Sequence, residues 1–180
     1  MSERISVDSF LGIFARTGFR KASMDDLARA TGVSRQALYN RFGSKAGLIE
    51  WAISAMIERS LADALRCLES PGATLVARLL AALDAWAGQH MPMLRASPHG
   101  IEVAVMVARD PAEAVRAAER KLIAAMANTI RLSGPGSAVS RAGSMAQALC
   151  WTAKGLVHAA PDHASFRREL ELIVGALLAR

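Results

Sequence analysis

Aromatic side chains are scarce in this chain, and strand-forming patterns are missing. Aromatic residues make up 5% of its 180 residues although 52% are hydrophobic, so the apolar residues are largely alanine and leucine. These residues favour helices, and no run of alternating β-branched residues is present to indicate a sheet. We therefore expect an all-α fold, in a chain of one or two domains that is long enough to bury a sizeable core.

Cysteines and long apolar runs are also few. The two cysteines, Cys67 and Cys150, lie far apart and lack the spacing of metal ligands. The first residues, MSERISVD, are polar, and no apolar run approaches the length that crosses a bilayer. We therefore expect a cytoplasmic protein with reduced thiols, without a metal, a cofactor or a membrane segment.

Motifs of common enzyme sites are absent as well. The four histidines form no His-Glu-x-x-His pattern, and no glycine-rich phosphate loop follows a strand. No serine or cysteine nucleophile motif appears either. No catalytic residue is predicted, and we do not expect an enzyme.

The most informative segment that is present spans residues 23–45 and reads SMDDLARATGVSRQALYNRFGSK. Ser23 and Asp26 form a capping pair that predicts a helix from Met24. Gly32 suits the left-handed position after a helix end, and Ser34 caps a second helix that runs from residue 35 to 42. Two helices joined by a short glycine-containing turn indicate a helix-turn-helix, whose second helix enters the DNA major groove.

This segment resembles the TetR (tetracycline-repressor-like) family of bacterial transcription regulators over about residues 5–55. The resemblance rests on several short motifs at matching spacing: Phe14, Gly18-Phe19, Ser23-Met24-Asp25-Asp26-Leu27-Ala28, Gly32-Val33-Ser34, Leu38-Tyr39-x-x-Phe42 and Ser44-Lys45. It implies a dimeric repressor that binds a palindromic operator and is released by a small molecule. It also implies that Tyr39 and Lys45 contact DNA phosphates.

Side-chain chemistry on the second helix predicts the other DNA contacts. Arg35 suits guanine, Gln36 suits adenine and Ala37 suits a thymine methyl, so these three are the predicted base contacts. The predicted phosphate contacts are Ser23, Tyr39, Asn40, Arg41 and Lys45. Residues 1–45 hold eight Lys or Arg against four acids, a net +4 out of +6 for the whole chain, as phosphate binding requires.

The helical pattern predicts about nine helices in two domains. A helix-turn-helix domain is expected over residues 1–45, with a fourth helix from residue 44 to about 69 linking it to a helical body over residues 46–180. Later helices are expected at about 110–132, 137–159 and 162–179. The residues predicted for dimerisation lie on the last two helices: Ala146, Ala153, Phe166, Leu170, Ile173 and Leu177. Burial of the final helix within its own monomer is the alternative.

The effector site is the least determined part of the prediction. Methionine and tryptophan suit a variable apolar pocket, although such residues also fill ordinary cores. The candidates are Trp86, Met93, Met106, Met126, Met145 and Trp151, and the expected ligand is apolar or aromatic. The alternative function is a basic helical protein that binds DNA architecturally or serves another interaction, without an effector.

Overall fold

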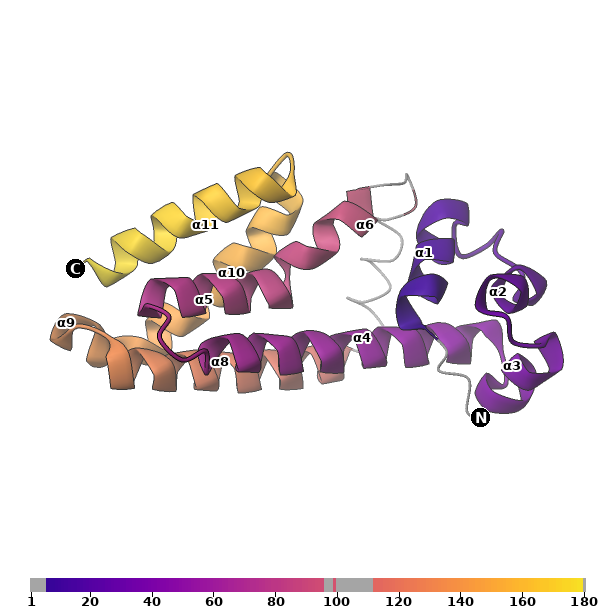
Figure 1. Cartoon of the computed structure of the whole chain (residues 1–180), viewed down its shortest axis with the longest axis horizontal. Helices are drawn as coiled ribbons and strands as arrows, with labels where there is room; N and C mark the ends of the chain where they lie inside the picture. Colours follow the sequence, from indigo (N-terminus) through magenta and orange to yellow (C-terminus); the bar gives the residue numbers. More distant parts are fainter. Residues whose placement is uncertain (1–5, 96–98, 100–111, 180) are drawn as a thin grey trace. The chain divides into compact units, whose positions relative to one another are not determined.

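The computed structural model describes residues 6–95, 99 and 112–179. These residues contain ten α-helices, one short 3-10 helix and no strand, as the composition predicts (Figure 1). The helices fall into two compact units. Unit 1 consists of the described residues up to Glu58 and from Met93 to Val115, and unit 2 of those in Arg59–Pro92 and from Arg116 onward.

Unit 1 is built from α1 (Val7–Thr17), α2 (Met24–Thr31), α3 (Arg35–Phe42) and the first half of α4 (Lys45–Leu68). Helix α2 packs against both α1 and α3. The core of this unit is fully buried and comes from all four helices: Phe10, Phe14, Leu27, Leu38 and Leu48. A small apolar core thus holds the two motif helices at a fixed angle.

Caps determine where the motif helices begin and end. The Ser23 hydroxyl accepts a bond from the Asp26 amide at 3.1 Å, and the Asp26 carboxylate accepts one from the Ser23 amide at 3.0 Å, which completes a capping box. Gly32 ends α2 at φ 71°, a left-handed conformation that glycine adopts without a steric penalty. Ser34 then accepts a bond from the Ala37 amide at 3.1 Å and begins α3. The predicted helix-turn-helix is therefore confirmed residue by residue.

Unit 2 contains the rest of α4, α5 (Leu75–Trp86), the 3-10 helix η1 (Gly88–His90), most of α8 (Ala112–Ser133), α9 (Gly136–Val139), α10 (Ala142–Ala159) and α11 (His163–Leu178). The short α6 (Met91–Arg95) begins at its edge. Helices α5, α10 and α11 pack on one another. One polar contact adds to this packing, since His163 Nε2 of α11 lies 2.6 Å from Asp84 Oδ1 of α5. A second joins α10 to α8, where Lys154 Nζ lies 2.6 Å from Glu119 Oε1.

One predicted helix is wrong in its extent. The segment 137–159 was expected to be continuous, but it is divided into α9 and α10 because Arg141 leaves the helical region at φ −106° and ψ 6°. The start signal expected at Asp110 lies outside the described residues. Helix α11 agrees with its prediction, since Asp162 caps it by accepting a bond from the Ser165 amide at 2.7 Å.

Candidate functional site

Helix α3 presents almost its whole surface to solvent. Of its eight residues only Leu38 is buried, and Phe42 is half-buried. The remaining six, which include all the predicted base contacts, are exposed. An exposed helix of this kind can lie against a ligand surface along its full length.

The predicted base contacts are held by their neighbours before any DNA is present. Arg35 Nη1 lies 3.0 Å from Oδ2 and 3.3 Å from Oδ1 of Asp25, and its guanidinium lies 5.5 Å from the centre of the Tyr39 ring. The Gln36 amide donates to Asn40 Oδ1 at 2.8 Å. Because these partners are exposed and polar, the two side chains can exchange them for base edges at low cost.

Arg41 is organised by an aromatic cluster that consists of Phe10, Phe42 and Trp51. Its guanidinium lies 5.3 Å from the ring centre of Phe42 and 5.5 Å from that of Trp51. The Phe42 and Trp51 rings lie 4.9 Å apart. The cluster restricts the arginine while its charge stays exposed, an arrangement suited to a phosphate.

Lys45 is placed differently from the other predicted phosphate contacts. Its amine donates to the carbonyl oxygens of Phe19 at 2.7 Å and Ala22 at 2.9 Å, and lies 3.4 Å from that of Arg20. The side chain is half-buried. These contacts join residues 23 to 26 positions apart, so no sequence pattern pointed to them.

Ser23 is exposed at the start of α2, but its hydroxyl is engaged with Asp26, to which it donates at 2.6 Å. This hydrogen bond is the largest cause of a lowered pKa at the Asp26 carboxyl group. Ser23 therefore lies in unit 1 with the other candidates, as an ordered N-cap. The structure thus places the eight predicted DNA residues at the N-cap of α2, in α3 and in the first turn of α4.

Four of the six residues predicted for the dimer interface are instead buried within their own chain. Ala146, Ala153 and Phe166 have no exposed surface, and Leu170 is 1% exposed. They pack where α10 and α11 meet the rest of unit 2, so they offer no surface to a second copy. Ile173 and Leu177 remain half-exposed.

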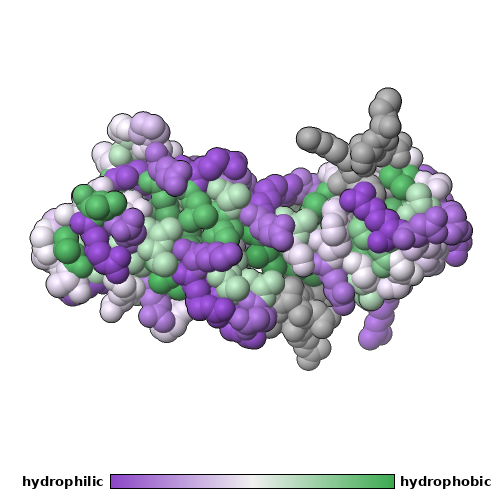
Figure 2. Space-filling view, turned by 90° about the horizontal axis from the view of Figure 1, so that it is seen from below, coloured by the Kyte–Doolittle hydropathy of each residue, from purple (hydrophilic) through white to green (hydrophobic). Residues whose placement is uncertain are grey.

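Large apolar side chains are nevertheless exposed on these last two helices. Trp151 of α10 is 61% exposed and Leu172 of α11 is 68% exposed. Small exposed residues surround the tryptophan along α10: Gly143, Ala148 and Gly155. In Figure 2, a view from below in which α4 and α8 rather than α11 face the reader, unit 2 shows further hydrophobic surface between hydrophilic side chains.

The predicted pocket residues do not come together around a described cavity. Trp86, Met126 and Met145 are buried in unit 2, at 9%, 0% and 4% exposure. Met93 belongs to unit 1, and Trp151 is exposed. Met106 lies outside the described residues.

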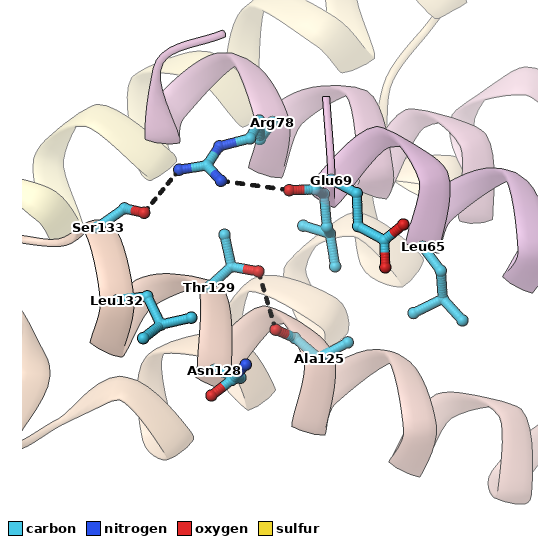
Figure 3. Close-up of a pocket in the computed structure, with 9 residues that line it drawn as sticks. Leu65, Glu69, Arg78, Ala125, Asn128, Thr129, Leu132 and Ser133 are labelled. Atoms are coloured by element: carbon cyan, nitrogen blue, oxygen red, sulfur yellow. Dashed lines mark hydrogen bonds between the residues drawn. The ribbon is translucent and has the colours of Figure 1, made fainter. Parts of the chain in front are cut away.

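A crevice of about 380 Å³ lies elsewhere in unit 2, between α4, α5 and α8 (Figure 3). Arg78 crosses it, donating to Ser133 Oγ at 2.7 Å and to the Leu68 carbonyl at 3.3 Å, while its Nε is buried without a partner. The remaining lining mixes apolar and polar residues: Leu65, Glu69, Ala125, Asn128, Thr129 and Leu132. None of the six predicted pocket residues lines this crevice.

Other kinds of site find little support among the described residues. No group of three or more His, Cys, Asp or Glu side chains is positioned to hold a metal ion there. Both cysteines are free, and burial raises the pKa of the Cys150 thiol to about 11. None of the described helices has the length and apolar character needed to cross a membrane.

The comparisons with known proteins agree with this geometry. A sequence profile described as "Bacterial regulatory proteins, tetR family" matches residues 11–52. Over 60 residues the chain is 33% identical to the uncharacterized HTH-type transcriptional regulator YezE of Bacillus subtilis (strain 168). That match covers 33% of this chain and 31% of YezE, so it spans about a third of the relative's length.

Solved structures show that the similarity in fold extends over the whole chain. A transcriptional regulator from Rhodococcus sp. RHA1 has a TM-score of 0.74 at 20% identity, covering 99% of this chain and 97% of that one. FadR from Bacillus subtilis, solved in complex with stearoyl-CoA, has a TM-score of 0.60 at 14% identity, covering 96% of each chain. The chain thus combines a helix-turn-helix that matches the TetR-family profile over residues 11–52 with an all-helical fold similar to that of these solved regulators.

Proposed function

We propose that this regulator binds a palindromic DNA operator as a homodimer, with one α3 helix of each copy in the major groove. The single observation that carries this is the polar, almost fully exposed surface of α3, fixed by caps and by the core of unit 1. One such helix reads few bases, so two copies on a two-fold site are needed for specific affinity.

In this proposal Arg35, Gln36 and Ala37 contact bases, while Tyr39, Asn40, Arg41 and the N-cap Ser23 contact phosphates. The guanidinium of Arg35 matches the paired acceptors of guanine, and the amide of Gln36 matches adenine. Each such pair contributes about 1–3 kcal/mol of discrimination against a wrong base. The preorganised partners Asp25 and Asn40 limit the side-chain entropy that binding removes.

The test compares Arg35→Ala plus Gln36→Ala with the wild-type chain on a duplex selected from a random pool. Each variant is also measured on a scrambled duplex of equal length. We expect the ratio of the two affinities to fall at least about a hundredfold. Arg16→Ala, which removes one positive charge from α1, is the matched control and should keep the ratio.

A wild-type chain that binds every duplex with equal affinity and a steep salt dependence would contradict the proposal. That outcome favours the alternative function, an architectural DNA-binding or interaction protein without an effector.

The second copy is proposed to cover the exposed sides of α10 and α11. Trp151 and Leu172 are large apolar side chains in contact with water in a single chain, and burying each contributes about 1.5–3 kcal/mol. The residues that remain from the sequence prediction, Ile173 and Leu177, are half-exposed on the same helix as Leu172.

A small-molecule effector is also proposed to bind unit 2, and to favour the conformation that does not fit the operator. An apolar or aromatic ligand agrees with the many buried apolar side chains of this unit, and the FadR complex with stearoyl-CoA is one example of a ligand held by this fold. The crevice beside Arg78 fits such a ligand when it also carries a carboxylate. The repressor is proposed to act in the cytoplasm, where its DNA and reduced thiols are found.

A thermal-shift screen tests this effector proposal. Uncharged aromatic compounds and aromatic carboxylates are compared on the wild-type chain and on Arg78→Met. Stabilisation by carboxylates that Arg78→Met abolishes places the ligand in the crevice, whereas stabilisation by uncharged compounds in both chains places it in the core of unit 2. If no compound shifts the melting temperature or weakens DNA binding, the effector proposal is wrong.

A further inference from the structure

The amine of Lys45, the first residue of α4, is surrounded by backbone oxygens. It donates to the carbonyls of Phe19 and Ala22 at 2.7 and 2.9 Å and lies 3.4 Å from that of Arg20. It also lies 4.5 Å from the centre of the Phe19 ring. All of these groups belong to unit 1, in the connection between α1 and α2.

The donor capacity of this amine is therefore used within the domain. An ammonium group carries three protons, and three carbonyl oxygens stand around this one. Leaving a half-buried carbonyl oxygen without a hydrogen-bond donor is destabilising. To reach a DNA phosphate, Lys45 has to give up at least one of these bonds.

The segment that Lys45 holds leads directly to the recognition motif. Ala22 precedes Ser23, the N-cap of α2, and the Phe19 ring lies 5.8 Å from the ring of buried Phe14. Gly18 turns the chain at φ 77° and accepts a bond from the Ala22 amide at 3.1 Å. The connection is thus a tight turn, closed on one side by the unit's core and on the other by the amine.

We propose that Lys45 is a positioning residue: it ties the start of α4 to the α1–α2 connection and so fixes the N-terminus of α2, rather than donating to a DNA phosphate. Asp25, on the same α2, holds Arg35 of α3. The chain of contacts therefore runs from α4 through α2 to the proposed base reader. This inference rests on the proposed DNA-binding function.

The salt dependence of DNA binding separates the two roles. A lysine that neutralises a phosphate contributes about 0.9 to the slope of log affinity against log salt concentration. A positioning residue contributes nothing to that slope, although its loss lowers affinity. The measurement needs only random-sequence duplex DNA, so it does not depend on knowing the operator.

The experiment compares the wild-type chain with Lys45→Met and Lys45→Arg. We expect both variants to bind the duplex about tenfold more weakly, a change of about 1.4 kcal/mol, with an unchanged slope. Arginine keeps the charge and binds phosphate well, but its planar fork cannot place three N–H groups on converging carbonyls. Lys21→Met, an exposed lysine in the α1–α2 connection, is the control for loss of one charge.

A slope that falls by about 0.9 in Lys45→Met and is restored in Lys45→Arg would overturn the proposal. Wild-type affinity in both variants would overturn it as well. Should neither variant fold, the amine protons of Lys45 are followed in the wild-type chain by nuclear magnetic resonance. Slowly exchanging amine protons that do not shift on DNA addition support the positioning role, and a large shift contradicts it.

Failure of the proposed function has a different signature. A wild-type chain without any affinity for duplex DNA removes the DNA-binding proposal. In that case the exchange of the Lys45 amine protons still shows whether the residue holds the α1–α2 connection.

Discussion

Helices α3 and α11 divide their side chains between solvent and the protein interior in opposite ways. Helix α3 buries one of its eight residues, and the polar side chains that it exposes are paired with neighbours such as Asp25 and Asn40. Helix α11 buries Phe166, Leu170, Val174 and Leu178, and still exposes Leu172 to solvent. A surface of paired polar groups suits a polyanion, and one of exposed apolar groups suits another protein.

The largest expected effect concerns the buried side of α11. Phe166→Ala removes a fully buried ring that packs beside His163, and should lower the free energy of unfolding by about 3–5 kcal/mol. Leu172→Ala, on the exposed side of the same helix, should change the stability of the single chain by no more than about 0.5 kcal/mol. Urea unfolding at low protein concentration measures both, and similar losses would contradict the division into two sides.

The exposed apolar surface should matter for assembly. Trp151→Lys plus Leu172→Lys should weaken self-association at least about thirtyfold, because central apolar contacts contribute about 2 kcal/mol or more each. Sedimentation velocity measures the change. Leu132→Lys on α8 is the matched control, since this leucine is 77% exposed but lies on neither of the last two helices. If the dimer persists in the chain that carries both substitutions, the interface lies elsewhere on the protein.

Asp25 should tune how α3 discriminates between DNA sequences. Asp25→Asn removes a negative charge from the motif and releases Arg35, so affinity for random duplex should rise by up to about fivefold. The ratio of selected to random affinity should fall accordingly. Glu50→Gln, an exposed acid on α4, is the control. An unchanged ratio in Asp25→Asn would show that Arg35 needs no such partner.

The smallest expected effect is a dependence on pH at the start of α2. The hydrogen bond from the Ser23 side chain, followed by that from its backbone, lowers the pKa of Asp26. A lowered folded-state pKa means that the stabilisation is complete above the unfolded value of about 3.9 and is lost as the pH falls through the folded value. The difference in melting temperature between the wild-type chain and Ser23→Ala should therefore become smaller as the pH falls through the folded-state value, and the part that remains reflects the N-cap bond from the Asp26 amide, which is lost in the variant at every pH. A constant difference at all pH values would contradict this.

The sequence predicted the local structure of the motif well because caps and turns are local. Ser23, Gly32 and Ser34 begin and end their helices where the sequence indicated. The sequence was less informative about contacts between residues that lie far apart along the chain. Periodicity shows that Phe166 and Leu170 lie on an apolar stripe, but it cannot tell whether a helix of the same chain or a second copy covers that stripe. The structure shows that both residues are buried within their own chain, where α11 packs on α5 and α10.

The same limit applies to the candidate site. The resemblance assigned Lys45 to phosphate, while its bonds to residues 19–22 depend on how α4 meets the α1–α2 connection. The Arg78 crevice likewise joins residues up to 68 positions apart, from Leu65 to Ser133. Such groupings arise from packing, and no motif in the sequence records them.

The most direct test of the central proposal is the selection of duplexes by the purified full chain from a random pool, at about 150 mM salt. We expect enrichment of a two-fold palindrome whose half-sites lie about one helical turn apart, and its loss in the Arg35→Ala plus Gln36→Ala chain. A folded wild-type chain that enriches no sequence would contradict the proposal that α3 reads bases.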